Sequence, residues 1–263
     1  MITINISASD LAKLTGDNTY EPFQNIVDKI LVNNKLLNKY IPKSNLERFL
    51  MQLSYNQRNQ IIAFLELPRK SAPFVISKAI VSRYVYPSFS KEVTELQSKQ
   101  LIDVNLPPFL SILNSSIKKD LQIRRGNIKE LGNIGKYENK FKRKVTDRNS
   151  KLFQKVLYID PDGKFQIVIR GRVDGMSEED SCIIESKNRS RYLFKKLRPY
   201  ERVQIEAYMF LSGMQRCILT EYYNDESFEI DYSHDEAYWN ECCGKIIYSV
   251  RCILKSGPSK LGE

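Results

Sequence analysis

Three polar residues with the side chains needed for phosphodiester chemistry stand in apolar surroundings. Asp174 follows the stretch "RGRV", while Glu185 and Lys187 come eleven and thirteen residues later, after "CII". Residues two apart in a strand share a face, so Glu185 and Lys187 point to the same side. A hairpin that brings Asp174 beside Glu185 would set two like charges against each other, and a divalent cation would relieve that repulsion. The pattern therefore predicts a metal site with a lysine beside it.

The expected metal is Mg²⁺, with Mn²⁺ as a substitute, because Mg²⁺ prefers oxygen ligands and completes its shell with water and phosphate. Such an ion polarises a phosphoryl group and activates the attacking water, which Lys187 would orient or help to deprotonate. The alternative is a surface ion pair, since Glu-x-Lys arises often by chance. The apolar flanks favour a buried strand end, and hence a phosphodiesterase site.

The elements that must position these residues alternate between strands and helices. The segment 151–175 has two apolar runs around Asp-Pro-Asp-Gly, which predicts a hairpin. Further strands are expected in "SCIIESKN", "RCILTEYYN" and "SFEIDYS", with helices in "PYERVQIEAYMFLSGM" and at 235–255. This order predicts an α/β core with a mixed β-sheet flanked by helices. The first 125 residues have mostly helical periodicity, which predicts an N-terminal mostly helical subdomain.

The charge balance favours a polyanionic partner. The chain has 41 Lys and Arg against 31 Asp and Glu, and basic residues cluster at 117–129, 136–144 and 187–198. Clustered basic charge indicates nucleic acid, whose phosphates are contacted without regard to sequence. The alternative for each cluster is a solvated helix face. The expected DNA-backbone contacts are Arg125, Arg189, Arg191, Lys195, Lys196 and Arg198.

Other kinds of chemistry find little support. The five cysteines all follow residue 181 and form no CxxC pair, so neither a zinc site nor a redox site is expected, and buried thiols in an intracellular protein are the simpler interpretation. An iron–sulfur cluster is excluded because no cysteine precedes Cys182. His234 is the single histidine, which argues against serine–histidine chemistry and histidine-bound metals. We expect neither a secretory signal nor a membrane span.

Four short motifs occur in the order of a known nuclease superfamily: Gly-x-x-x-Glu at 126–130, Gly-x-x-Asp-Gly at 171–175, Glu-x-Lys at 185–187 and Gln-x-x-x-Tyr at 204–208. The chain thereby resembles the PD-(D/E)XK nucleases, and within them the lambda exonuclease and YqaJ-type viral recombinase branch, related to RecB nuclease domains. The opening "ISASDLAKLTGDNTY" is similar to that of the branch. The resemblance covers residues 1–20 and 120–225, and 21–120 match nothing known to us.

The resemblance implies a restriction-endonuclease-like nuclease core at 121–255, a DNA-contacting helical region at 1–120 and a tail at 256–263. Asp174 and Glu185 would bind the metal directly, with the backbone carbonyl of Ile184 as a further ligand. Glu130 would reach it from the preceding helix through water, and Glu138 is the alternative for this role. The remaining implied roles are those of Lys187 on the nucleophilic water, Gln204 as a brace of the site, and Tyr208 as a DNA contact or packing residue. Pro161-Asp162 is excluded from the site, because we expect it to form a hairpin turn.

The branch implies a Mg²⁺-dependent exonuclease acting on duplex DNA ends in recombination, repair or replication, with a ring-shaped homo-oligomer and a single-strand annealing partner. For a viral protein, the compartment would be the cytoplasm or nucleus of the infected host. In the branch an N-terminal arginine holds a 5′-phosphate, but this chain has no arginine before Arg48, so Ser7, Ser9 and Lys13 are the candidates. The alternatives are an endonuclease using the same site and a non-catalytic nucleic-acid-binding module.

Overall fold

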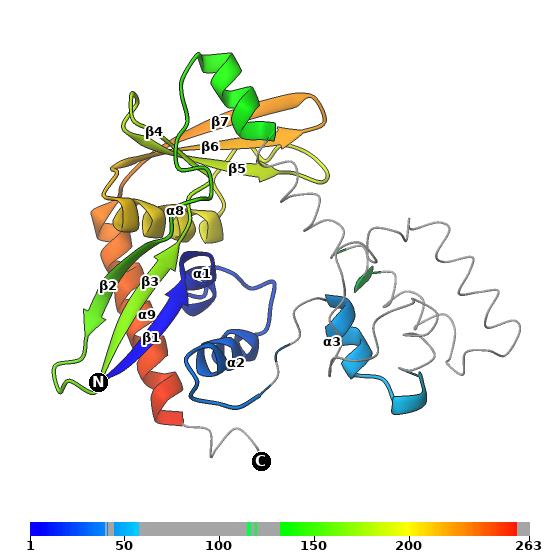
Figure 1. The fold of residues 1–263 in the computed structure, drawn as a ribbon, viewed down its shortest axis with the longest axis vertical. Helices are drawn as coiled ribbons and strands as arrows, with labels where there is room; N and C mark the ends of the chain where they lie inside the picture. Colours follow the sequence, from blue (N-terminus) through cyan, green and yellow to red (C-terminus); the bar gives the residue numbers. More distant parts are fainter. Residues whose placement is uncertain (40, 42–44, 58–114, 117–118, 120–131, 257–263) are drawn as a thin grey trace, which may run out of the picture. The chain divides into compact units, whose positions relative to one another are not determined.

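The computed structural model describes residues 1–39, 41, 45–57, 115–116, 119 and 132–256 (Figure 1). The chain divides into two compact units, one of residues 1–39 with 129–263 and the other of residues 40–128. In the second unit, helix α3 spans Asn45–Met51. All the strands of the described residues and the helices discussed below lie in the first unit.

The first sheet has the strand order β1-β3-β2, with β1 at Ile2–Ser7, β2 at Phe153–Ile159 and β3 at Phe165–Gly171. β2 and β3 form the predicted antiparallel hairpin, whose turn at 160–164 contains Pro161 and Asp162. β1 joins β3 in parallel over its whole length, although more than 150 residues separate them in the chain. The N-terminus is therefore part of the same sheet as the hairpin.

The second sheet has the order β4-β5-β6-β7, with β4 at Gly175–Ser177, β5 at Cys182–Asn188, β6 at Arg216–Tyr223 and β7 at Glu226–Ser233. β5 and β6 run parallel, while the outer pairs are antiparallel. A parallel pair needs a long crossover, and helix α8 at Pro199–Ser212 supplies it. The predicted mixed α/β fold is confirmed.

Helix α8 lies between the two sheets, with helix α9 (Glu236–Ser256) running along the first sheet (Figure 1). Because sheets cover both sides of α8, its apolar residues Val203, Ile205, Ala207 and Met209 are all buried. Burial on several faces also encloses polar residues of this helix, which then need partners inside the protein. No helix among the described residues is long and apolar enough to cross a bilayer.

The predicted helical region at 1–120 has a different organisation at its start. Residues 2–7 form β1 with Ile4 and Ile6 buried, followed by a 3₁₀ turn at Ala8–Asp10, helix α1 at Leu11–Leu14 and helix α2 at Phe23–Asn33. These residues pack in the compact unit that holds the strands, so the boundary near residue 120 does not separate them from the core. The alternating isoleucines of "ITINIS" are the period-two signal of a strand. Residues 58–114 lie outside the described part.

Candidate active site

The β4–β5 ladder brings the two predicted carboxylates together. Gly175 pairs with Ile184 in antiparallel register, which places Asp174 next to Glu185 on the neighbouring strand. Asp174 is 8% exposed and Glu185 only 1%. The strand can run here because Gly175 has no side chain, since a Cβ would lie 2.2 Å from Cγ1 of Val145. Two acidic side chains therefore meet in a largely water-excluded place.

A chain of hydrogen bonds links the predicted residues across β5 and α8. Lys187 Nζ donates to Glu185 Oε1 at 2.5 Å and to Gln204 Oε1 at 3.4 Å. Gln204 Nε2 donates to the Tyr208 hydroxyl at 2.8 Å, as two residues one helical turn apart can do. The backbone N–H of Ser186 donates to Asp174 Oδ2 at 2.8 Å. These hydrogen bonds thus join five predicted residues in one cluster: Asp174, Glu185, Lys187, Gln204 and Tyr208.

The buried carboxylates determine the charge of their neighbours. Burial by itself disfavours the Lys187 ammonium, but Glu185 and Asp174 more than offset this, so the pKa of Lys187 is raised above its usual value. Burial, and then the charge of Glu185, raise the pKa of the Tyr208 phenol. Both groups therefore carry their protons at neutral pH. Lys187 can orient a water or a phosphate oxygen as a donor while it balances the carboxylate charge.

The donor set fits a cation that prefers oxygen, because two carboxylates lie on adjacent strands and the buried Ile184 is next to one of them. Within the described part, no group of three or more His, Cys, Asp or Glu residues could hold a metal ion. The predicted third carboxylate, Glu130, lies outside the described residues, as does Arg125. Of the carboxylates predicted to bind the metal directly, the structure therefore describes both, Asp174 and Glu185, and places them on adjacent strands.

Glu138, the alternative helix carboxylate, has other partners. Its Oε1 accepts a hydrogen bond from the Val145 backbone N–H at 2.8 Å, and its Oε2 pairs with Arg148. The Val145 hydrogen bond and Arg148 together hold the pKa of Glu138 below its usual value. This side chain ties the helical segment 132–141 to the chain that follows it, a structural role that engages both of its oxygens.

Asn133 is a buried residue near the cluster that the sequence analysis did not single out. Its side-chain amide donates to Ser186 Oγ at 3.1 Å and to Asn188 Oδ1 at 3.0 Å, while its backbone carbonyl accepts from the Tyr222 hydroxyl at 3.0 Å. These bonds fasten the start of segment 132–141 to the face of β5 opposite Glu185 and Lys187. A single asparagine gives no spacing signal, so only the structure could identify it.

Arg189 was predicted to contact DNA, but in the structure its guanidinium is paired inside the protein. Its side chain is 8% exposed, and its guanidinium pairs with Glu201 of α8 and Glu221 of β6, both essentially inaccessible. Burial disfavours the guanidinium, but the two carboxylates more than offset this and raise the pKa of Arg189. The guanidiniums of Arg189 and Arg198 both lie over the Phe194 ring, with their Cζ atoms 4.4 and 3.9 Å from the ring centroid. Arg189 therefore joins α8 to the second sheet.

The other predicted DNA contacts vary in exposure. Arg191, Lys195 and Lys196 are exposed, and Arg198 is partly buried against Phe194. In the N-terminal group, Ser7 and Ser9 are exposed, at and just after the end of β1. Lys13, by contrast, already pairs with Asp10 at 3.2 Å and Glu21 at 3.0 Å, so its charge is balanced within the protein. The exposed members are those that remain accessible to a phosphate backbone.

The described residues thus form a mixed α/β fold with two sheets around α8. An alkaline exonuclease from Laribacter hongkongensis, LHK-Exo, is similar in structure over 96% of this chain and 89% of its own, with 12% sequence identity and a TM-score of 0.51. LHK-Exo in complex with dAMP is similar over 95% of this chain and 88% of its own, with 13% identity and a TM-score of 0.48. A phage related exonuclease from Haemophilus somnus is similar over 82% of this chain and 93% of its own, with 12% identity and a TM-score of 0.35. No family model matches the sequence, and neither does any curated protein. The similarity to LHK-Exo shows a shared fold, in agreement with the resemblance that the motifs carry.

Proposed function

We propose that the protein is a metal-dependent DNA exonuclease that hydrolyses phosphodiester bonds at duplex ends. The observation that carries this proposal is the cluster of Asp174, Glu185, Lys187 and Gln204, joined across β4, β5 and α8. An ammonium bonded to one of two buried, adjacent carboxylates is the arrangement that the Mg²⁺ hypothesis requires. The fold shared with an alkaline exonuclease supports the same conclusion.

In this proposal Asp174, Glu185 and the Ile184 carbonyl would hold Mg²⁺, with Glu130 as a further carboxylate for the ion. The bound ion would polarise the scissile phosphate and lower the pKa of a water molecule. Lys187 donates a hydrogen bond to that water or to a phosphate oxygen. Gln204 holds the Lys187 ammonium in place from α8, since its amide oxygen accepts from Nζ.

The DNA would be held by sequence-independent contacts. Arg191, Lys195 and Lys196 follow β5 directly and are exposed, so they can reach phosphates near the cluster. Ser7 and Ser9 are accessible donors for a terminal phosphate. The family resemblance adds a homo-oligomer, a single-strand annealing partner and a role in viral recombination or repair, which we include in the proposal.

The test is cleavage of end-labelled linear duplex beside a covalently closed circle, in Mg²⁺ and in EDTA. We expect loss of the linear substrate only, in Mg²⁺ only, and no loss with Lys187→Ala. Lys245→Ala, which changes a surface lysine of α9 paired with Glu241, is the matched control and should cleave as the wild type does. Cleavage of the circle would replace the exonuclease with an endonuclease at the same site. Undiminished cleavage by Lys187→Ala would refute the proposed mechanism.

A further inference from the structure

The β5–α8 loop, residues 189–198, displays an aromatic ring close to the candidate active site. Tyr192 is 56% exposed and follows Lys187 by five residues in the chain. Five residues span at most about 18 Å when fully extended. One strand of DNA advances about 3.4 Å per nucleotide, so Tyr192 lies within roughly five nucleotide lengths of a phosphate bound at Lys187.

The β5–α8 loop is fastened to the second sheet near both of its ends. The Arg189 backbone N–H donates to the Tyr222 carbonyl at 2.8 Å, and the Lys195 backbone N–H donates to Glu221 at 2.8 Å. The guanidinium of Arg189 pairs with the same glutamate. Because these bonds fix the loop, Tyr192 loses little conformational freedom when a partner binds to its ring.

Phe194 of the same loop supports the Tyr192 ring. The two rings meet edge to face, with their centroids 5.2 Å apart and their planes at 78°. Phe194 is itself half-buried, with the guanidiniums of Arg189 and Arg198 over its ring. The edge-to-face contact holds the Tyr192 ring in place while more than half of the residue stays accessible. The loop thus presents a fixed platform on which a flat partner can stack.

The basic residues next to Tyr192 favour a nucleic acid strand as this partner. Arg191, Lys195 and Lys196 are all exposed. None of these three side chains makes an ion pair with another residue that the structure describes, so their charges are available to phosphates. Proteins bind single strands without regard to sequence by combining such cations, which follow the backbone, with aromatic rings that stack on the bases.

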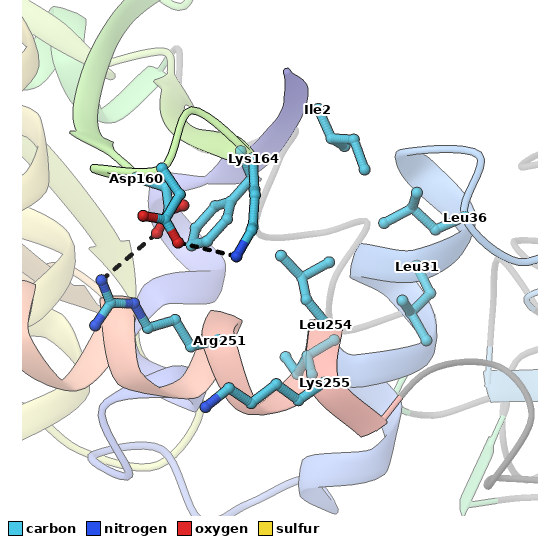
Figure 2. A pocket seen from close by; sticks show the side chains of 11 residues that line it. Ile2, Leu31, Leu36, Asp160, Lys164, Arg251, Leu254 and Lys255 are labelled. Atoms are coloured by element: carbon cyan, nitrogen blue, oxygen red, sulfur yellow. Dashed lines mark hydrogen bonds and ion pairs between the residues drawn. The ribbon is translucent and has the colours of Figure 1, made fainter.

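The cavity at the end of the first sheet that carries the β2–β3 turn lacks these features. It has a volume of about 790 Å³ and opens between that turn, the start of β1 and the ends of α2 and α9 (Figure 2). Two of the cations that line it already have carboxylate partners, since Lys164 pairs with Asp162 at 2.9 Å and Arg251 lies 3.6 Å from Asp160. Phe165 is the one aromatic residue among its described lining residues, and it is only 7% exposed. The cavity therefore offers no ring on which a base could stack.

We propose that Tyr192 stacks on an unpaired nucleobase at the end of the DNA substrate, while Arg191 and Lys196 hold the adjoining phosphates. This inference rests on the proposed function, because the DNA substrate is what brings a base to the loop. Exposing the face of a base costs least where the base is mismatched or single-stranded. The preferred substrate is therefore a duplex whose end is frayed or carries a short single strand.

The experiment measures the binding of fluorescent duplexes by anisotropy in EDTA, so that neither metal nor cleavage enters the readout. One duplex has a short unpaired end. A second has the same unpaired nucleotides without their bases, which keeps every phosphate. We expect the wild type to bind the first duplex about tenfold more tightly than the second, as the stacking of one base allows. Tyr192→Ala should lose this difference, whereas Tyr192→Phe, which keeps the ring, should retain it.

Two further variants separate stacking from charge and from effects on the fold. Arg191→Met should weaken the binding of both duplexes by the same factor, because it removes a phosphate contact and leaves the ring in place. Tyr248→Ala, which removes a tyrosine of α9 that is 71% exposed, should bind both duplexes as the wild type does. Melting curves check that the variants fold. If Tyr192→Ala does not fold, Tyr192→Leu, which has no aromatic face, replaces it with the same expected loss.

Equal or undetectable binding of the two duplexes by the wild type would overturn the proposal, as would a preference that Tyr192→Ala retains. The outcome is distinguishable from that of the proposed function. A preference that depends on Tyr192, without any cleavage in Mg²⁺, would support the stacking and count against the nuclease. Cleavage of linear DNA in Mg²⁺ without such a preference would count against the stacking alone.

Discussion

The buried position of Arg189 leads to a quantitative prediction about stability. Arg189→Met removes one guanidinium that serves two carboxylates, those of Glu201 and Glu221, and keeps an unbranched apolar side chain in place of the aliphatic part of the arginine. The guanidinium donates to Glu201 at 2.6 and 3.1 Å and to Glu221 at 2.6 Å. We therefore expect the free energy of unfolding to fall sharply.

The size of the loss in stability depends on the partners that each carboxylate keeps. Breaking a buried ion pair by removing one partner costs about 3–5 kcal/mol, because the other charge stays buried and uncompensated. Here each carboxylate keeps one backbone donor, from Arg198 to Glu201 at 3.2 Å and from Lys195 to Glu221 at 2.8 Å. These donors reduce the loss of stability at each carboxylate, but two carboxylates are affected. We therefore expect the free energy of unfolding to fall by about 4 kcal/mol. At roughly 2–4 °C per kcal/mol, the melting temperature should fall by roughly 8–16 °C.

The assay is urea and thermal unfolding followed by circular dichroism, with DNA binding measured at low and high salt. Arg191→Met is the matched control, because Arg191 lies two residues away and is exposed. Its stability should stay within about 0.5 kcal/mol of the wild type, while its DNA affinity should fall. If Arg189→Met unfolds like the wild type but binds DNA weakly, Arg189 contacts DNA as the sequence analysis expected, and the buried network is refuted.

Three further predictions concern the site and its supports. Lys187→Ala should lower single-turnover cleavage in Mg²⁺ by about 10²- to 10⁴-fold, and EDTA should abolish wild-type cleavage; a smaller loss than tenfold would contradict the role of the ammonium. Because the pKa of Glu138 is lowered on folding by the Val145 N–H and Arg148, its contribution to stability is complete above its unfolded pKa and lost as pH falls through its folded pKa. The difference in unfolding free energy between wild type and Glu138→Gln, measured in urea, should therefore shrink in acid, and a constant difference would argue against it. Gly175→Ala should destabilise the protein by about 1–3 kcal/mol through its clash with Val145, and Val145→Ala in the same chain should recover part of that loss; additive effects in thermal unfolding would exclude the clash.

Local patterns were sufficient to predict the elements that carry the candidate site. The Asp-Pro-Asp-Gly turn between apolar runs indicated the β2–β3 hairpin, and the apolar "CII" before Glu185 indicated β5. The spacing of Gln204 and Tyr208 placed both on one face of α8, where they are hydrogen bonded. Each of these predictions depends on the geometry of a single strand, turn or helix.

Contacts between distant segments could not be predicted in the same way. β1 pairs with β3 across more than 150 residues, so the alternating isoleucines of residues 2–7 can indicate a strand but not which strand it pairs with. Arg189, in the basic cluster at 187–198, was expected to contact DNA, yet it faces Glu201 and Glu221. The sequence shows the charge of a cluster of residues, whereas the burial of each side chain depends on which elements pack over it.

The sequence by itself determined the chemistry available to this protein: the carboxylates, the lysine and the faces of the elements that carry them. Periodicity is sufficient for this, because a strand repeats every two residues and a helix every 3.6. Only the tertiary structure decided which polar groups meet, such as Asn133 with Ser186, and which lie in a cavity, such as Asp160 beside Arg251. Those outcomes depend on packing between segments far apart in the chain. The packing sets the distances between charged groups and excludes water from them, and the strength of charge interactions depends on both.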